Sequence, residues 1–226
     1  MWMNSDELRA LEPQQERSRA TRRRILATTN HLLRTRSFAS LSVQEIAAAS
    51  GGSIGAFYGR FRGKDDLLEP LHDRHYRGML RVLRRAMASP DWKSMSLEAR
   101  LEWITRMAVW AFRSRRWLIR ALAVFVRQDD KKLTGPQFAR RSEFSRNARL
   151  LLADFGDEIA HVDREGAIDF ALFLISTLCR ERVLFGELSE REWVVEGDDA
   201  IVTEVARAAY THLTAESSAR GMWLGA

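Results

Sequence analysis

Apolar residues recur at helical spacing through most of this chain, and that periodicity limits its fold more than any other feature. No alternating strand pattern recurs, and only four prolines interrupt the 226 residues. The pattern therefore predicts an all-α fold. We expect helices over residues 17–36, 65–88, 97–113, 115–128, 137–155, 164–186 and 199–216, with two shorter helices between the first two of these.

The two short helices are separated by a turn that contains glycine. Ser42 can cap the first of them, and Glu45 three residues later completes a capping box. A break at Ser50 and Gly51 then ends this helix, and Ser53 can cap the second. A long supporting helix followed by two short helices and a tight turn is typical of a helix-turn-helix, whose second helix must enter a DNA groove.

Positive charge is concentrated over the same helices. The whole chain has 36 basic and 30 acidic residues, which gives a net charge of +6. Between Pro13 and Lys64, ten basic residues stand against two acidic ones, so this segment alone carries a charge of +8. Because binding to phosphates needs cations on the docking surface, this distribution fits DNA as a partner, but the charge alone fits an ordinary solvated arginine face equally well.

The segment from Leu41 to Leu68 resembles the DNA-binding signature of the tetracycline-repressor (TetR) family. The match covers roughly residues 17 to 71. Its family-register positions are Ile46, Ala47, Gly51, Ser53, Gly55, Tyr58, Phe61, Lys64 and Leu67. The chain departs from the family pattern at Ser50, where alanine is usual, at Gly52, where a branched apolar residue is usual, and at Arg60, where histidine or tyrosine is frequent.

The resemblance implies DNA contacts from the two short helices and the residues beside them. DNA phosphates and backbone oxygens would be held by Ser42, Tyr58, Arg60 and Lys64. Base edges or thymine methyl groups would be read by Gln44, Ile54 and Gly55, and Ser53 at the start of the second short helix completes the set. Phe57 and Phe61 fall on the apolar face of that helix and are expected in the core.

A second, helical domain is expected after the helix-turn-helix. We expect a flexible arm over 1–16, the DNA-binding domain over 17–64, a regulatory domain over 65–217 and a tail over 218–226. Helix 164–186 is apolar on more than one side and helix 199–216 is amphipathic, so the two are expected to form a homodimer interface, as in the family. A two-fold dimer would place two recognition helices in successive major grooves of a palindromic operator in double-stranded DNA.

A small-molecule effector site is expected in the regulatory domain, and its ligand would release a repressor from the operator. Aromatic side chains are abundant there, and they can either line an apolar cavity or fill an ordinary core. The family resemblance, more than spacing, selects the candidate pocket residues Trp103, Met107, Trp110, Arg141, Phe144 and Phe170. The expected ligand is hydrophobic or aromatic, with any anionic group held by Arg141 or Arg180.

Other chemistries have little support in the sequence. The glycine spacing before Lys64 is one residue short of a phosphate-binding loop, and His72 and His75 lack a second pair of metal ligands. No nucleophile motif is visible, so we expect no catalysis, no metal and no cofactor. The single Cys179, the lack of an apolar leader and the lack of a long apolar span indicate a cytoplasmic protein without a membrane segment. The alternative function is a basic-surface protein that binds an anionic membrane or another polyanion.

Overall fold

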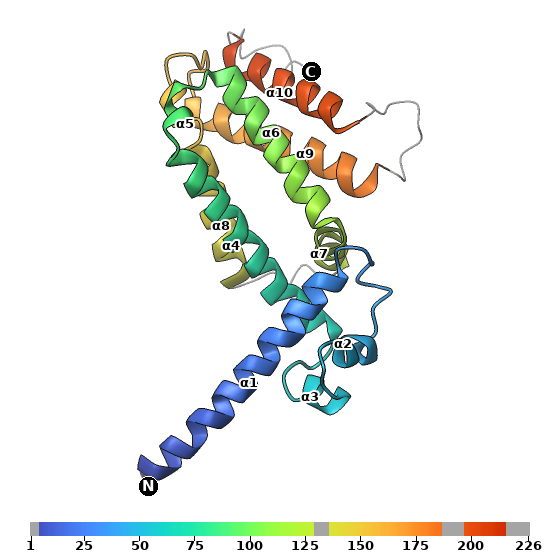
Figure 1. Ribbon diagram of the computed structural model, residues 1–226. Helices are drawn as coiled ribbons and strands as arrows, with labels where there is room; N and C mark the ends of the chain where they lie inside the picture. Colours follow the sequence, from blue (N-terminus) through green and yellow to red (C-terminus); the bar gives the residue numbers. More distant parts are fainter. Residues whose placement is uncertain (1–4, 129–135, 187–196, 216–226) are drawn as a thin grey trace, which may run out of the picture. The chain divides into compact units, whose positions relative to one another are not determined.

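The structure of the protein, a computed structural model, describes residues 5–128, 136–186 and 197–215. Within these ranges all regular structure is helical, which confirms the expected all-α fold (Figure 1). In the same ranges, no helix combines the length and the hydropathy that crossing a lipid bilayer requires. The chain divides into two compact units, the first formed by Met1–His75 with Trp117–Gln137 and the second by Tyr76–Arg116 with Phe138–Ala226.

The first unit contains the three helices of the expected helix-turn-helix. These are α1 (Ser5–Leu32), α2 (Val43–Ala49) and α3 (Ile54–Tyr58), followed by a 3₁₀ turn (Lys64–Leu67) and the start of α4 (Leu68–Met87). α1 begins at Ser5 rather than at Arg17, so residues 5–16, expected to be part of a flexible arm, are helical. This stretch is rich in Glu, Leu, Ala, Gln and Arg, whose intrinsic propensity favours a helix even without apolar periodicity.

An apolar core holds the first unit together. Its buried members are Ile25, Leu33, Phe38, Leu41, Ile46, Ala47, Phe57, Phe61, Leu67, Leu68, Leu71, Leu118 and Leu122. The last two belong to α7 (Arg116–Gln128), which lies far from the other members in the sequence. Fully burying one Leu, Ile or Phe side chain contributes about 1.5–3 kcal/mol, so α7 is an energetic part of this core. The compact unit thus extends beyond the range of 17–64 expected for the DNA-binding domain.

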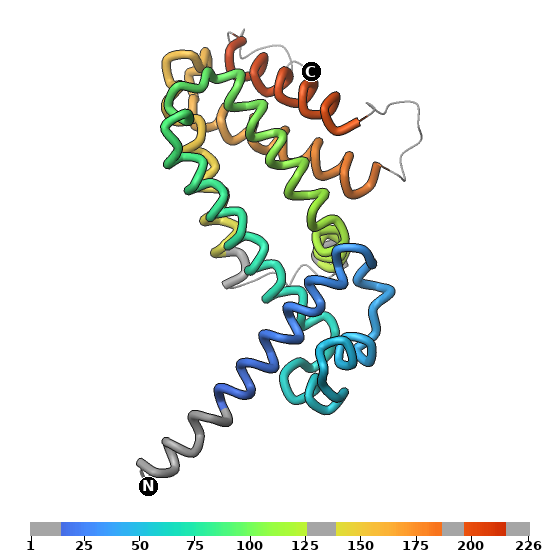
Figure 2. The backbone as a smooth tube through the Cα atoms, viewed as in Figure 1, coloured from blue at the N-terminus to red at the C-terminus, as the bar shows by residue number. Residues whose placement is uncertain are grey.

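The second unit is a bundle in which α6 (Leu97–Ser114), α9 (Arg164–Phe185) and α10 (Asp198–Thr214) pack against one another (Figure 2). The short α5 (Pro90–Ser94), α8 (Pro136–Arg149) and a 3₁₀ turn (Ala153–Phe155) also belong to it. Proline occupies the first position of both α5 and α8, where its missing N–H has no helical partner to lose. The helix expected over 137–155 ends at Arg149 in the structure, and the last residues of the expected range form the 3₁₀ turn instead.

A buried arginine connects several elements of the second unit. Arg100, which is 1% exposed, lies between the rings of Trp92 and Phe155, with its guanidinium carbon 4.5 and 4.4 Å from their centroids. It donates hydrogen bonds to the carbonyl oxygens of Trp92 (2.5 Å) and Leu151 (3.2 Å) and to the carboxylate of Asp154 (3.1 Å). A buried charge is tolerated only with such partners, so we expect this arginine to fix how α5 and the 3₁₀ turn pack on α6.

Candidate nucleic-acid interface

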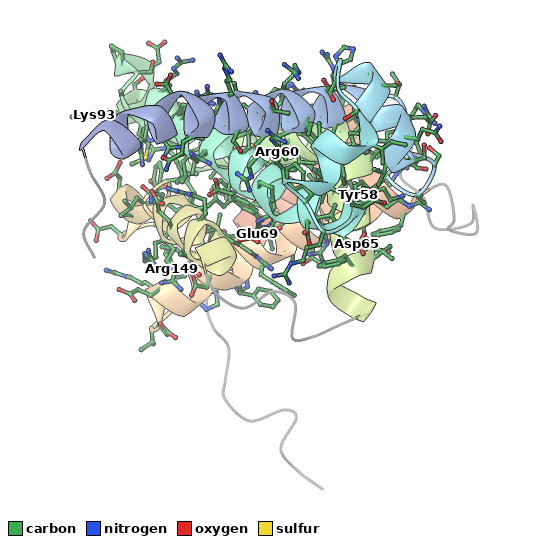
Figure 3. The ribbon with its side chains drawn as sticks, turned by 90° about the horizontal axis from the view of Figure 1, so that it is seen from below. Tyr58, Arg60, Asp65, Glu69, Lys93 and Arg149 are labelled. Atoms are coloured by element: carbon green, nitrogen blue, oxygen red, sulfur yellow. The ribbon has the colours of Figure 1, made fainter. Side chains whose placement is uncertain are left out.

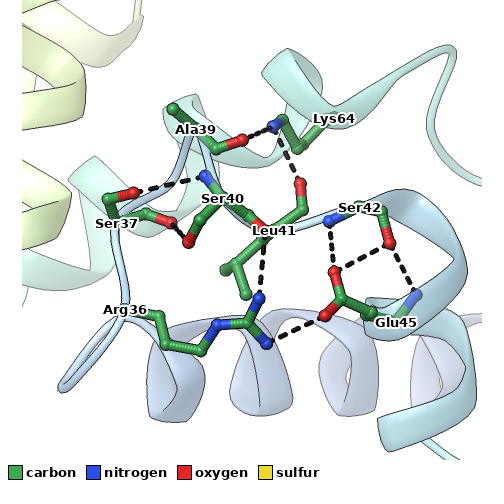
Figure 4. A network of polar contacts seen from close by, with 8 residues as sticks. All are labelled: Arg36, Ser37, Ala39, Ser40, Leu41, Ser42, Glu45 and Lys64. Carbon is green, nitrogen blue, oxygen red and sulfur yellow. Dashed lines mark hydrogen bonds and ion pairs between the residues drawn. The ribbon is translucent and has the colours of Figure 1, made fainter.

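The start of α2 is fixed by a reciprocal capping box, as the sequence predicts (Figure 4). The backbone N–H of Glu45 donates to the Ser42 hydroxyl oxygen at 3.1 Å, and the backbone N–H of Ser42 donates to the Glu45 carboxylate at 2.8 Å. The Ser42 hydroxyl itself donates to the same carboxylate at 2.8 Å. The only hydroxyl proton of Ser42 is therefore used within the protein, and a DNA phosphate would have to displace the carboxylate to accept it.

The Glu45 carboxylate also joins α2 to the end of α1. The Arg36 guanidinium forms an ion pair with it at 3.0 Å and donates to the Ser40 carbonyl oxygen at 3.0 Å. The hydrogen bond from the Ser42 backbone lowers the pKa of Glu45 most, and the Ser42 hydroxyl and Arg36 lower it further, from 4.5 to about 2. The carboxylate is thus charged throughout the neutral pH range, which keeps the capping box closed.

The turn between α2 and α3 depends on one glycine with a positive φ angle. Gly51 has φ +66°, a left-handed conformation that costs an L-amino acid side chain energy even though a Cβ here would meet no atom within 4 Å. Ser50 before it is buried, and its hydroxyl donates to the Ala47 carbonyl oxygen at 2.9 Å. The serine that replaces the family's usual alanine is therefore accommodated by a hydrogen bond inside the turn.

α3 has one buried face and one exposed face. Phe57 is fully buried and Phe61 is 4% exposed, with their ring centroids 5.4 Å apart, which confirms that both belong to the core. On the other face, Ile54 is 43% exposed, Tyr58 is 55% exposed and Gly55 has no side chain. Ile54 and Tyr58 thus form the apolar part of the exposed face of α3.

Arg60 follows α3 and connects it to α1. Its Nε donates to the Ser18 carbonyl oxygen of α1 at 3.2 Å, and its Nη1 donates to the Ala56 carbonyl oxygen at 2.9 Å. Figure 3 shows the side chain beside α1, whereas Tyr58 lies away from it. Because a guanidinium has five N–H groups, these two bonds leave donors available for a phosphate.

Lys64 has no such surplus. Its ammonium donates to the carbonyl oxygens of Phe38 (2.9 Å), Ala39 (3.3 Å) and Leu41 (2.8 Å) and lies 4.9 Å from the centroid of the Phe38 ring. An ammonium group has three N–H donors, and all three point at protein carbonyls. The residue that the family resemblance assigns to a phosphate thus closes the loop between α1 and α2, as the dashed contacts in Figure 4 illustrate.

Two other residues predicted to contact DNA, Gln44 and Ser53, lie at the surface. Gln44 on α2 is exposed, and the Ser53 hydroxyl caps α3 by accepting the Ala56 N–H at 3.1 Å. Much of the accessible positive charge lies on α1, where the exposed arginines are Arg17, Arg19, Arg22, Arg23 and Arg24. None of these five guanidinium groups forms an ion pair with another described residue, which leaves their charge available to an anionic partner.

Three of the residues proposed for an effector pocket pack against different partner rings. Trp103 packs on Trp92 with centroids 5.0 Å apart, and Phe144 packs on Tyr76 at 5.5 Å. Phe170, 50% exposed, contacts the His212 ring at 4.8 Å. Of the other candidates, Met107 is half-buried, Trp110 is 57% exposed and Arg141 is exposed.

Sequence reasoning missed Tyr76, a half-buried tyrosine of α4 whose ring packs on the candidate Phe144, because nothing in its local pattern distinguishes it. It also missed the supporting roles of Arg36 and Ser18, which bond to α2 and to Arg60. Only the role of Ser18 had a signal in the sequence, namely the unusual arginine at position 60, which donates to the Ser18 carbonyl oxygen.

Comparison with known families agrees with the geometry of the site. Residues 25–71 match the model of the family described as bacterial regulatory proteins, tetR family. Comparison with curated proteins gives no match.

Solved structures share the fold over most of the chain. A tetR-family transcriptional regulator from Streptomyces coelicolor aligns with a TM-score of 0.60 and 17% identity, covering 84% of this chain and 79% of that one. A regulatory protein of the same family from Rhodococcus RHA1 aligns with a TM-score of 0.59 and 18% identity, covering 85% and 96%. AibR, crystallised with isovaleryl coenzyme A and operator DNA, aligns with a TM-score of 0.52 and 19% identity, covering 88% and 98%. At these identities the likeness establishes a common fold.

Proposed function

We propose that this chain, whose residues 25–71 match the tetR family of bacterial regulatory proteins, is a DNA-binding transcriptional repressor that a small-molecule effector releases from its operator. The observation that carries the proposal is the outer face of α3, where Ile54 and Tyr58 are exposed beside the buried Phe57. An exposed apolar pair on the second helix of a helix-turn-helix suits contact with thymine methyl groups and sugars in a major groove.

The DNA contacts divide into two groups. Gln44, Ile54, Gly55 and Tyr58 read the bases and adjacent backbone from α2 and α3. Phosphates are bound by the exposed arginines of α1, by the remaining donors of Arg60 and by the Ser53 hydroxyl. Ser42 and Lys64 act within the protein instead, because their donors already have acceptors in the chain.

The repressor acts as a homodimer through α9 and α10. The proposal is supported by two phenylalanines on α9, Phe170 and Phe173, which are 50% and 61% exposed, and by Leu178, which is 44% exposed. Apolar side chains gathered on one helix would be covered by the same helix of a second copy. Two recognition helices related by two-fold symmetry then read half-sites about 34 Å apart, which makes the operator palindromic.

The dimer can be tested by placing a charge on this face. Phe173→Asp should convert the dimer to a monomer in sedimentation velocity, because a carboxylate cannot be buried in an apolar contact without a partner. Val162→Asp is the matched control, since Val162 is 94% exposed and lies before α9. A dimer that survives Phe173→Asp as well as it survives the control contradicts the assignment of this interface.

The effector binds in the second unit. Support comes from the fold that this chain has in common with AibR, whose structure contains isovaleryl coenzyme A together with operator DNA. In a two-state regulator, a ligand changes DNA affinity only if it binds one conformation more tightly than the other. The effector therefore stabilises the conformation of the dimer that does not match the spacing of the operator half-sites.

DNA recognition is tested by selecting bound duplexes from a random pool with the full-length protein. We expect the selected sequences to contain two inverted half-sites, and the affinity to fall steeply as salt rises. Ile54→Ala and Tyr58→Ala should weaken binding to the selected sequence more than to unrelated DNA, whereas Val162→Ala should change neither. Selection of no common sequence, or equal binding to anionic vesicles and DNA, would contradict the proposed function.

A further inference from the structure

A hollow of about 250 Å³ lies along one side of α8, in the second unit. Its lining consists of three arginines and two serines, namely Arg141, Ser142, Ser145, Arg146 and Arg149. These positions are spaced i, i+1, i+4, i+5 and i+8, so they share one face of the helix. A neighbouring face carries the buried Ala148 and the half-buried Phe144. The basic and hydroxyl groups are therefore gathered by the helix register rather than dispersed around it.

Two acidic residues near this face, Glu143 and Asp169, are paired with arginines. Glu143 accepts hydrogen bonds from Arg84 at 3.2 Å and from Arg140 at 3.1 Å. The carboxylate of Asp169 on α9 forms a bidentate ion pair with Arg149, the arginine labelled in Figure 3. Arg149 is thus held in position, but its charge is largely compensated.

Arg141 and Arg146 carry uncompensated charge at the same hollow. Neither guanidinium forms an ion pair or hydrogen bond with another described residue. The Ser142 and Ser145 hydroxyls beside them are exposed and can donate as well. Two uncompensated guanidinium groups with two hydroxyl donors form a set of charge-assisted donors for an oxyanion, and phosphate oxygens fit the bidentate guanidinium geometry.

A half-buried tyrosine of α4 packs against α8. The ring of Tyr76 lies edge-on to Phe144, with centroids 5.5 Å apart. Burial raises the pKa of the Tyr76 phenol, and the positive charges of Arg141 and Arg180 oppose that rise. The charge of Arg141 therefore also acts on the side of α8 that packs against α4.

We propose that the hollow on α8 binds the phosphate groups of a phosphorylated small molecule through Arg141, Arg146, Ser142 and Ser145. As the site of an effector, this assignment rests on the proposed function. Sites for whole drug-sized ligands are usually about 300–1,000 Å³, so a hollow of about 250 Å³ is the size of an anionic head group. The rest of the ligand extends outside it.

The small number of uncompensated cations favours a small anion over an extended polymer. A nucleic acid or an anionic membrane presents many more phosphates than Arg141 and Arg146 can neutralise, because Arg149 is already paired with Asp169. A terminal phosphate or a diphosphate instead needs only the cations that the hollow contains. This is why the proposal commits to a small phosphorylated molecule.

The test measures the binding of ADP and of inorganic pyrophosphate to the full-length protein by calorimetry at constant ionic strength. We expect both probes to bind the wild type and to raise its Tm. The double variant Arg141→Gln with Arg146→Gln should bind both probes at least about tenfold more weakly, because each substitution removes a charged hydrogen-bonding group. The double variant Arg81→Gln with Arg85→Gln is the matched control, since it removes the same two charges from exposed positions of α4 outside the hollow. It should bind like the wild type.

The proposal is overturned if the wild type binds neither probe, or if the double variant binds them as tightly as the control does. Anionic vesicles and a duplex of unrelated sequence form the other arms of the experiment. If either polymeric surface, rather than ADP, binds in a manner that depends on Arg141 and Arg146, the ligand is not a small molecule and the proposal fails. Because the readout is binding and not release of DNA, failure here leaves operator recognition intact. Failure to select an operator leaves the phosphate site intact but removes its regulatory role.

Discussion

Replacing Lys64 by methionine should destabilise the first unit without changing the salt dependence of DNA binding. In the wild type, the ammonium donates to the carbonyl oxygens of Phe38, Ala39 and Leu41 at 2.9, 3.3 and 2.8 Å. Methionine keeps an unbranched side chain of similar length, but it has no donor for these three carbonyls. The loop between α1 and α2 therefore loses the group that closes it.

The magnitude follows from how exposed the carbonyls are. A hydrogen bond to a charged group contributes about 1.5–3 kcal/mol when it is well formed. Lys64 is half-buried and Ala39 is exposed, so water can replace part of what is lost, and the 3.3 Å bond contributes least. We expect a total loss of about 2–3 kcal/mol, including about 0.5 kcal/mol from the Phe38 ring. For a chain of this size, that corresponds to a fall in Tm of about 4–10 °C.

The assay compares thermal unfolding with DNA affinity measured over a range of salt concentrations. Each phosphate contact changes the slope of log affinity against log salt by about 0.9, so an internal Lys64 leaves the slope as it is. Lys64→Arg should also lose stability and keep the slope, because a planar guanidinium cannot direct three donors at the same carbonyls. A slope reduced by about 0.9 in Lys64→Met, with an unchanged Tm, would refute the reasoning and assign Lys64 to a phosphate.

Three further substitutions, one of them with a matched control, test the same unit. The pKa of Glu45 is lowered from 4.5 to about 2, so its contribution to stability is present above pH 4.5 and is lost as the pH falls towards 2; Glu45→Gln should remove this part of the acid dependence of the urea midpoint. Gly51→Ala should cost about 1–2 kcal/mol of unfolding free energy because of its positive φ, whereas Gly52→Ala, where a Cβ meets nothing closer than 3.8 Å, should be nearly neutral. Phe57→Ala should cost about 3–5 kcal/mol in chemical denaturation, and a loss below about 1 kcal/mol would contradict its placement in the core.

The local geometry of the helix-turn-helix could be predicted because each of its signals acts over a few residues. The capping box needs only the three-residue spacing of Ser42 and Glu45, and the turn needs one residue that tolerates a positive φ, which Gly51 provides. Helical spacing likewise separates Phe57 and Phe61, which are buried, from Tyr58, which is exposed. In each case the feature depends on residues that are close in the sequence, so periodicity and spacing are enough to predict it.

Contacts between distant residues could not be predicted in this way. Arg60 bonds to a carbonyl 42 residues earlier and Lys64 to one 26 residues earlier, and a backbone carbonyl has no sequence signature. Leu118 and Leu122 show the i, i+4 spacing of an amphipathic helix, but that spacing does not say which core they enter. The same limit applies to the second unit, where the abundance of aromatic residues does not indicate that Phe144 packs against Tyr76.

These internal contacts decide which groups are left for DNA. The donors of Ser42 and Lys64 are taken up by α2 and by the loop before it, so they cannot also hold phosphates without weakening the motif. In the proposed DNA complex, the electrostatic affinity comes mainly from the exposed arginines of α1, whereas discrimination between sequences comes from Ile54 and Tyr58 on α3. Arg23→Gln should therefore reduce the salt slope equally on all DNA, and Ile54→Ala should leave the slope unchanged but narrow the gap between operator and random sequence. If both variants lowered affinity by the same factor on every duplex, the assignment of electrostatic affinity to α1 and of sequence discrimination to α3 would be wrong.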